Sequence, residues 1–284
     1  MKRILVIGAT GRIGRQVVSE LLATDAGVRA MTRNPDDAGL PSDVEVVRGD
    51  LTAPESLDAA LDGVDTVFLL WTAPADAVPA AVERFARHAS RVVFLSSPHQ
   101  TPHPFFQQPN PMAAMHANIE RSIEASGLGW TFLRPGMFAA NTLLWWAPQI
   151  RAGNVVRWPY GDAPTAPVHE RDIAAVAVRA LLDSGHNGKD YVLTGPESLT
   201  QREQVIAIGE VIGRPLRFEE MTPHEARQEF KAPPPVVNML LNAWAAALGQ
   251  PALVTSKIEE ITGRPARSFR DWVSDHAGEF RAAL

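Results

Sequence analysis

Residues 4–14 of the chain read Ile4-Leu-Val-Ile-Gly-Ala-Thr-Gly-Arg-Ile-Gly14. The first four form a short apolar run, which is typical of a parallel strand buried on both faces. Glycines stand at positions 8, 11 and 14, and apolar residues then recur at positions 17, 18, 21 and 22, the spacing of one helix face. The stretch therefore predicts a strand, a glycine-rich turn and a helix in direct succession.

The same alternation of strand and helix continues toward residue 140. Apolar runs predict further strands at 28–32, 44–47, 64–70, 92–95 and 130–133. Amphipathic spacing predicts helices at 54–61, 76–89 and 112–125. Because repeated β-α-β units imply a parallel sheet, the expected fold class is α/β, a doubly wound parallel sheet of the Rossmann type.

Beyond residue 140 the pattern is less regular. It predicts helices at 170–182 and 201–212 and a strand at 191–194. We therefore expect residues 1–140 to form the main part of a Rossmann domain. Residues 141–284 are expected to form mostly a smaller C-terminal α+β lobe, with some segments returning to the sheet. The proline run Lys231-Ala-Pro-Pro-Pro235 cannot continue a helix and predicts a turn or a mobile flap.

Composition excludes several classes of protein. The 284 residues carry 27 Lys and Arg against 32 Asp and Glu, a net charge of -5, so there is no basic excess for direct nucleic-acid binding. The absence of cysteine excludes disulfides, thiolate metal sites and cysteine nucleophiles. No apolar stretch reaches the roughly 20 residues of a membrane helix, and the N-terminal run is too short for a signal sequence. We expect a cytoplasmic protein with no membrane partner.

The glycine-rich turn is the first candidate binding site. Such a turn lets the backbone approach a pyrophosphate, whose charge is stabilised by the N–H groups of the following helix N-terminus. The alternative is a turn that needs glycine for its geometry alone. The candidate contacts to a bound dinucleotide here are Gly8, Thr10, Gly11, Arg12, Ile13 and Gly14.

The end of the second predicted strand bears on the choice of dinucleotide. An NAD site usually places an acidic residue about 20 positions after the turn, where it binds the ribose hydroxyls. Arg33 stands at this strand end instead. Its planar guanidinium suits a 2′-phosphate, so NADP(H) is expected in preference to NAD(H). A solvent-exposed side chain is the alternative for Arg33, and also for Arg12.

Two further strand ends carry candidate cofactor contacts. Asp50, after the third predicted strand, is a candidate to bind the adenine amino group, with Leu51 beside it. The alternative for Asp50 is an N-cap or an Asx turn. Leu70 ends the fourth predicted strand and Trp71 follows it, at the same edge of the sheet.

Motifs along nearly the whole chain resemble the NmrA-like branch of the atypical short-chain dehydrogenases/reductases. The resemblance implies NADP(H) at the carboxyl edge of the sheet, with the smaller lobe covering the nicotinamide and binding substrate. The motifs are the turn 8–14, Gly49-Asp-Leu51, Ser126-Gly-Leu128, Trp130-Thr-Phe-Leu-Arg-Pro135, Glu170-Arg-Asp-Ile-Ala-Ala175, Leu193-Thr-Gly-Pro-Glu197, Ile261-Thr-Gly-Arg-Pro265 and Ser268-Phe269.

The chain departs from the orthodox members of that superfamily at the catalytic helix. Alignment on Glu120 puts Met112 and His116 where those members carry the Tyr and Lys of Tyr-x-x-x-Lys. A methionine cannot deliver a proton, so alcohol dehydrogenation by the standard mechanism is not expected. Ser96 and Ser97 stand where the family places a catalytic serine, and without the tyrosine they are expected to hydrogen-bond cofactor or substrate. Pro135 is a further expected cofactor contact.

The resemblance implies hydride transfer to an electron-poor acceptor, such as a quinone, an imine or iminium ion, or a conjugated carbonyl. His116 is the candidate proton donor because its ordinary pKa lies near working pH. Packing beside the cofactor is the alternative role for His116. Phe105, His116, Met137, Phe138, Trp145 and Trp146, together with Phe106 and Trp71, are expected to form an apolar pocket for a small aromatic or conjugated substrate.

Two other expectations concern what the chain binds. Other family members bind the dinucleotide without turnover, so a non-catalytic NADP(H) redox sensor acting through a protein partner is the competing hypothesis. No metal site is expected. His99 and His103 have helical spacing, but Pro102 and Pro104 oppose a helix there.

Overall fold

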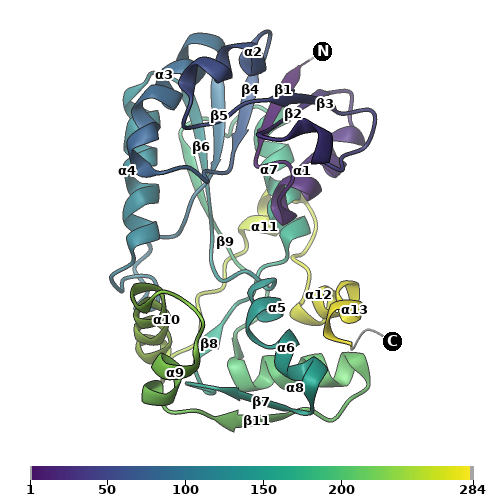
Figure 1. Ribbon diagram of the computed structural model, residues 1–284, viewed down its shortest axis with the longest axis vertical. Coiled ribbons are helices and arrows are strands. Elements are labelled where there is room, and N and C mark those ends of the chain that lie inside the picture. The colour runs from purple at the N-terminus through teal and green to yellow at the C-terminus, as the bar shows by residue number, and fades with distance from the viewer. Residues whose placement is uncertain (1, 282–284) are drawn as a thin grey trace.

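The computed structural model describes residues 2–281 and contains one large sheet (Figure 1). Its seven strands all pair in parallel. In spatial order they are β3 (Glu45–Arg48), β2 (Gly27–Thr32), β1 (Arg3–Ile7), β4 (Thr66–Leu69), β5 (Arg91–Leu95), β6 (Gly129–Pro135) and β9 (Lys189–Leu193). The direction of winding reverses between β1 and β4, and ligands bind in the crevice that such a switch point opens at the strand carboxyl ends. The expected doubly wound α/β fold is confirmed.

Helices cover both faces of this sheet, which is why its strands are apolar on both sides. Within β1, Ile4 and Val6 face one core cluster while Leu5 and Ile7 face the other. The first cluster is covered by α1 (Arg12–Leu22), α7 (Glu170–Leu182) and α11 (Lys257–Thr262), and the second by α2 (Leu57–Leu61), α3 (Val78–His88) and α4 (Pro111–Ala125).

Three short 3-10 helices connect strands to helices. They are η1 (Pro35–Asp37), η2 (Pro54–Ser56) and η3 (Ala75–Ala77). The predicted helices 54–61 and 76–89 therefore each consist of a 3-10 turn followed by an α-helix.

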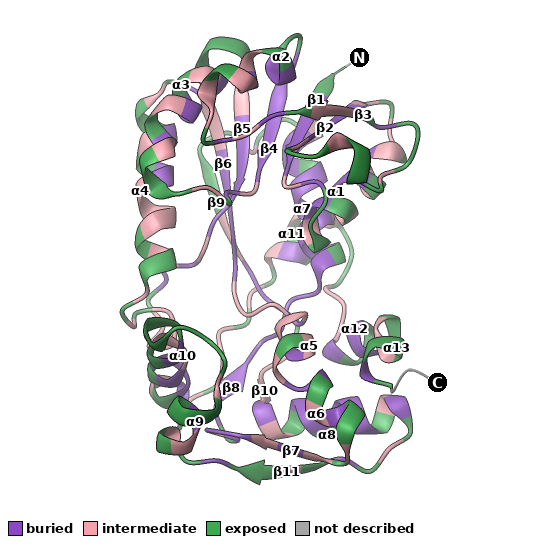
Figure 2. Ribbon diagram, viewed as in Figure 1, coloured by how far each residue is buried: buried purple, intermediate pink, exposed green. Residues whose placement is uncertain are grey.

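The remaining elements form a smaller lobe below the sheet in Figure 1. Figure 2 shows buried segments in its middle, where a third core cluster includes Trp146, Trp244 and Trp272. Its strands pair as β7 (Val155–Trp158) with β11 (Arg217–Glu220), in parallel, and β8 (Pro164–Thr165) with β10 (Leu199–Thr200), antiparallel. Its helices are α5 (Asn141–Trp145), α6 (Ala147–Ala152), α8 (Gln201–Ile212), α9 (Pro223–Glu229), α10 (Pro234–Ala247), α12 (Phe269–Asp275) and α13 (Ala277–Phe280).

The proline run 231–235 is both a turn and a helix start. Pro233 precedes α10, and Pro234 and Pro235 occupy its first turn. Proline fits there because the N–H groups of the first turn have no partner within the helix. Sequence analysis did not predict the 14-residue helix that follows. Across residues 2–281, no helix has the length and apolar character needed to cross a membrane.

Candidate dinucleotide and acceptor site

The turn between β1 and α1 has no room for a side chain at two of its glycines. Gly8 has a φ of +85°, a conformation that favours glycine, and a Cβ there would lie 2.9 Å from Leu70 Cβ. A Cβ on Gly14 would lie 2.1 Å from the Gly8 carbonyl oxygen. The backbone of α1 thus lies directly on the end of β1.

The N-terminus of α1 is suited to an anion. Gly11 precedes the helix, no side chain caps it, and its first turn carries no acidic residue. The first N–H groups of a helix lack intrahelical partners and carry a partial positive charge, so they stabilise a phosphate placed there.

A cavity of about 330 Å³ lies over this turn. Its walls come from the carboxyl ends of β1, β2, β3 and β4, which the sheet order brings side by side. Its place at the switch point and the absence of side chains at the turn fit the adenosine and pyrophosphate part of a dinucleotide. The predicted cofactor residues on these walls are Gly8, Thr10, Gly11, Arg33, Asp50, Leu51 and Leu70; Thr32 and Thr52 also line the cavity.

Arg33 and Asp50 lie close together at this cavity. Arg33 is exposed and has no ion-pair partner in the part of the chain described, residues 2–281. Asp50 Oδ1 accepts hydrogen bonds from Thr52 N (2.9 Å) and Thr52 Oγ1 (2.8 Å), so the Asx turn is present. The backbone hydrogen bond from Thr52 and the nearby Arg33 hold the pKa of Asp50 below its ordinary value.

Arg12, Ile13 and Phe138 line a second cavity, of about 250 Å³, between the start of α1 and α5. Arg12 forms an ion pair with Glu279 of α13 (3.2 Å). The two side chains are 42% and 45% exposed, so this contact contributes little stability by itself. The pair holds the guanidinium against α13, and Arg12 lines this second cavity rather than the one over the glycine turn.

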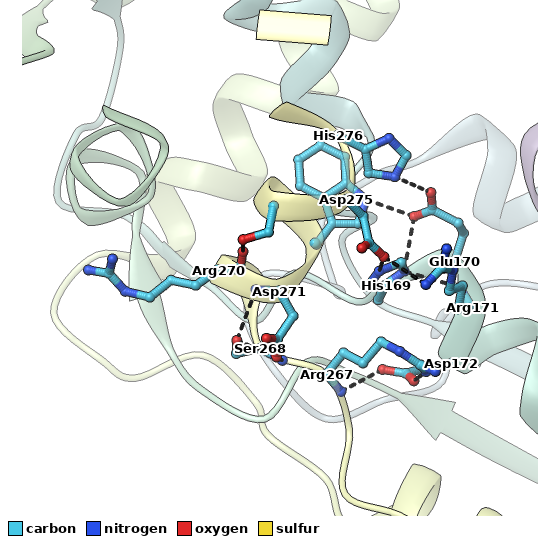
Figure 3. Close-up of polar contacts among 12 residues, drawn as sticks. His169, Glu170, Arg171, Asp172, Arg267, Ser268, Arg270, Asp271, Asp275 and His276 are labelled. Carbon is cyan, nitrogen blue, oxygen red and sulfur yellow. Dashed lines mark hydrogen bonds and ion pairs between the residues drawn. The ribbon is translucent and has the colours of Figure 1, made fainter. Parts of the chain in front are cut away.

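Contacts around His169 and Glu170 fasten the C-terminal segment to α7 (Figure 3), and Glu279 joins this network through His276. The buried Glu170, first residue of α7, accepts hydrogen bonds from Trp272 Nε1 (2.7 Å) and His276 Nε2 (2.6 Å). His276 Nδ1 lies 2.8 Å from Glu279 Oε1. His169 lies 3.2 Å from Asp275, which also pairs with Arg171.

Opposite pKa shifts accompany the contact between Glu170 and His276. The hydrogen bond with Glu170 raises the pKa of His276. Burial, the largest single effect, acts to raise the pKa of Glu170, but the contacts with His169 and His276 outweigh it and hold that pKa well below its ordinary value. Near neutral pH the two groups are therefore an ion pair.

The carboxyl ends of β5 and β6 carry a second buried network. Glu120 of α4 accepts two hydrogen bonds from Arg134, from Nε (3.0 Å) and Nη2 (2.7 Å). Ser96 Oγ donates to Glu120 Oε1 (2.6 Å), and Arg134 also pairs with Asp190 (2.9 Å). Ser96 is thus held by Glu120 in this structure. In the sequence, Glu120 served only as an alignment landmark. Arg134 stands inside an apolar strand and needs a buried partner, and this need was the signal that could have indicated Glu120.

His116 is poorly suited to the role of a charged proton donor. Burial, chiefly, and the nearby His99 lower the pKa of His116 to about 4. Its ring packs edge-on against Phe94, with centroids 5.7 Å apart. At neutral pH the imidazole is therefore uncharged, which contradicts the expectation of an ordinary pKa near working pH.

The aromatic residues expected in one pocket lie in different parts of the structure. Phe105, Phe106 and Met137 line a nearly filled space of about 10 Å³. Trp71 is buried in the core between sheet and helices, and its Nε1 donates to Ala73 O (2.6 Å). Trp146 is fully buried in the core of the smaller lobe, against which the partly buried Trp145 packs.

Two predicted cofactor contacts remain at the strand ends. Pro135 ends β6, and Ser97 follows Ser96 beyond β5, at the same edge of the sheet as the glycine turn. Ser97 Oγ is buried and has no hydrogen-bond partner within residues 2–281.

A family model described as NAD(P)H-binding matches residues 8–184. This chain belongs to the NAD(P)H-binding family. It is 42% identical to a (4-alkanoyl-5-oxo-2,5-dihydrofuran-3-yl)methyl phosphate reductase of Streptomyces griseus, over 98% of this chain and 99% of that protein. It is 34% identical to an NAD(P)H azoreductase of Xenophilus azovorans, over 99% of this chain and 100% of that protein.

Solved structures share the fold. The NADPH complex of the Escherichia coli quinone oxidoreductase QOR2 superimposes with a TM-score of 0.82 at 22% identity, covering 96% of this chain and 99% of that one. An NmrA structure gives a TM-score of 0.76 at 18% identity, covering 96% and 94%. The expected NmrA-like resemblance is confirmed, and this family member is an NAD(P)H-dependent oxidoreductase.

Gly14→Ala should destabilise the protein by about 1–3 kcal/mol or more, because the added methyl group meets a backbone oxygen that cannot move alone. Urea unfolding measures the change. Gly11→Ala is the matched control, since its Cβ would lie 3.4 Å from the nearest atom, Gly8 O, and should cost less than about 1 kcal/mol. Equal losses for the two variants would contradict this account of the turn.

His276→Gln should lower the free energy of unfolding by about 1.5–3 kcal/mol near pH 6 and by less near pH 9. The raised pKa of His276 means that its contribution is complete below its unfolded pKa and is lost as pH rises through its folded pKa. The variant-minus-wild-type difference is measured by urea unfolding at both pH values. His224→Gln, at an exposed position on α9, serves as control. A difference that does not change with pH would disprove the charged pair.

Proposed function

We propose that this chain is an NADP(H)-preferring reductase that delivers hydride to an electron-poor, conjugated acceptor. The proposed preference for NADP(H) rests on the position of Arg33. It lies at the cavity wall at the end of β2, exposed and without an ion-pair partner within residues 2–281, where a 2′-phosphate would need a cation.

The remaining cofactor contacts follow the walls of the cavity. The pyrophosphate would lie on the N-terminus of α1, over Gly8, Thr10 and Gly11. The adenine would lie between Leu51 and the end of β2, with Asp50 able to accept from its amino group through the oxygen that Thr52 leaves free. Arg12 would exchange its partner Glu279 for a phosphate oxygen.

The proposed acceptor class is inferred from the two relatives and from the absence of the orthodox tyrosine on α4. The two relatives named above are a reductase of a dihydrofuranyl methyl phosphate and an azoreductase. Met112 is 57% exposed at the start of α4, where orthodox enzymes carry their tyrosine. A conjugated acceptor suits this site, because the electron-poor carbon of the acceptor takes up hydride when this carbon and the nicotinamide are held in the correct orientation. Phe105, Phe106 and Met137 would provide its apolar contacts after moving apart, because the space that they line measures about 10 Å³.

Equilibrium titration of the protein with NADPH, NADP⁺, NADH and NAD⁺, followed by tryptophan fluorescence, tests the cofactor half of the proposal. Preference for NADPH over NADH, with turnover of a quinone, enone or azo compound, supports it. Tight binding without turnover of any acceptor class would support the redox-sensor hypothesis instead. No binding of any of the four would disprove the proposal.

Arg33→Asp should weaken NADPH binding by about 10- to 100-fold, the loss expected when a charged hydrogen bond to phosphate is removed, and should leave NADH binding within a few-fold. Arg121→Asp, the same charge change on an exposed position of α4, should alter neither affinity. An unchanged ratio of the two affinities in Arg33→Asp would show that Arg33 does not bind the 2′-phosphate.

A further inference from the structure

One side chain of α1, Arg15, fastens two walls of the dinucleotide cavity to each other. Its Nε donates to the Thr10 carbonyl oxygen in the glycine turn (3.0 Å). Its Nη1 and Nη2 donate to the carbonyl oxygens of Gly39 (2.6 Å) and Ala38 (2.8 Å), in the segment that follows β2. Thr10 lines the cavity, and so does Arg33 at the start of that segment. Arg15 therefore joins the wall proposed for the pyrophosphate to the segment that carries the proposed contact to the 2′-phosphate.

These contacts depend on both the arginine and a glycine. A guanidinium presents its N–H groups in one rigid plane, so it binds several carbonyl oxygens at fixed angles, which an ammonium group does not. Gly39 has a φ of +56°, in the left-handed region that favours glycine. With the backbone in this conformation, the carbonyls of residues 38 and 39 both reach Arg15. A Cβ at position 39 would lie 3.6 Å from Arg15 Nη2, so a methyl group has room there but the backbone conformation disfavours it.

The backbone determines where the side chain of Arg33 lies. Arg33 is exposed and has no ion-pair partner in the range 2–281, so no other side chain fixes the position of its charge. On one side the segment is tied to β2, where Asn34 N donates to Thr32 Oγ1 (3.3 Å). It then forms the 3-10 turn η1 and reaches the carbonyls that Arg15 binds. Loss of Arg15 would leave the second of these two attachments without its three hydrogen bonds.

We propose that Arg15 is a positioning residue for the preference for NADP(H). It holds the segment 33–39 against the glycine turn, so that Arg33 is placed for the 2′-phosphate before the nucleotide binds. Arg15 itself does not bind the phosphate, because all three of its nitrogens donate to backbone carbonyls. Such preorganisation removes part of the ordering cost from the binding step. This inference rests on the proposed function and names a second residue on which the cofactor preference depends.

Two nucleotide fragments separate this role from a general effect on the fold. The fragments 2′,5′-ADP and 5′-AMP differ only in the 2′-phosphate, so the ratio of their dissociation constants isolates the group that Arg33 would bind. Isothermal titration calorimetry of the full chain measures both constants, and no acceptor is needed. A residue that only stabilises the fold would change both affinities to the same degree and leave this selectivity ratio unchanged.

Arg15→Met should lower the preference for 2′,5′-ADP over 5′-AMP by about three- to tenfold, the factor expected when a loop side chain must be ordered during binding. The affinity for 5′-AMP should stay within about threefold of the wild-type value. Arg121→Met, at an exposed position of α4, is the control and should change neither constant. An unchanged selectivity ratio in folded Arg15→Met would overturn the proposal.

Two further variants test the same attachment and replace Arg15→Met if that variant does not fold. Arg15→Lys keeps the charge but loses the planar fork, so it should lower the selectivity ratio nearly as much as Arg15→Met. A wild-type ratio in Arg15→Lys would show that charge alone acts and would overturn the positioning role. Gly39→Ala should also lower the ratio. Gly213→Ala, at a φ of +72° after α8 with nothing within 4 Å of the added Cβ, is its matched control.

A double-mutant cycle tests whether Arg15 acts through Arg33. Adding Arg15→Met to Arg33→Ala should leave the selectivity ratio within about twofold of its value in Arg33→Ala alone, because the side chain to be positioned is absent. A further loss as large as in the wild-type background would show that the two residues act independently and would overturn the proposal. Equal affinity of the wild-type protein for 2′,5′-ADP and 5′-AMP would instead defeat the proposed preference for NADP(H), and this inference with it.

Discussion

The contact between Gly14 and the Gly8 carbonyl sets the position of everything at the carboxyl edge of the sheet. Because no side chain separates α1 from the end of β1, the helix begins directly over the strand and its N–H groups open into the crevice between β1 and β4. Leu70 closes over Gly8 from β4, and α7 packs against α1. This close contact between α1 and the end of β1 determines the positions of the cavity, of the first core cluster and of Glu170 at the start of α7.

Two buried carboxylates, one on each side of the sheet, show how polar groups are used around the site. Glu170 on α7 has its hydrogen bonds completed by Trp272 and His276, and it anchors the C-terminal segment. Glu120 on α4 is held by Arg134 and Ser96, but its neighbour His99 is left with an unsatisfied nitrogen. A complete buried network favours rigidity, whereas an incomplete one leaves a polar atom whose burial costs free energy.

Local sequence patterns predicted most of the sheet because each buried parallel strand is a continuous apolar run, as 4–7 and 92–95 are. The glycine turn and the position of Arg33 at the end of β2 were predictable for the same reason, since each depends on neighbours along the chain. The helix α10 was missed because its starting prolines also have the pattern of a helix breaker. Contacts between distant segments carry no local signal, so the partners of Glu120 and Arg12 and the burial of Trp146 in the smaller lobe required the structure.

The ion pair between Arg12 and Glu279 joins positions 267 residues apart. A ribosome makes a chain from its N-terminus, so the glycine turn emerges well before the segment that fastens beside it. The first strands of the sheet can therefore pair during synthesis, while the Arg12 guanidinium stays unrestrained until α12 and α13 have folded onto α7. The Arg12 side chain is thus placed later than the turn itself, and removal of α13 would free this guanidinium while leaving the backbone of the turn in position.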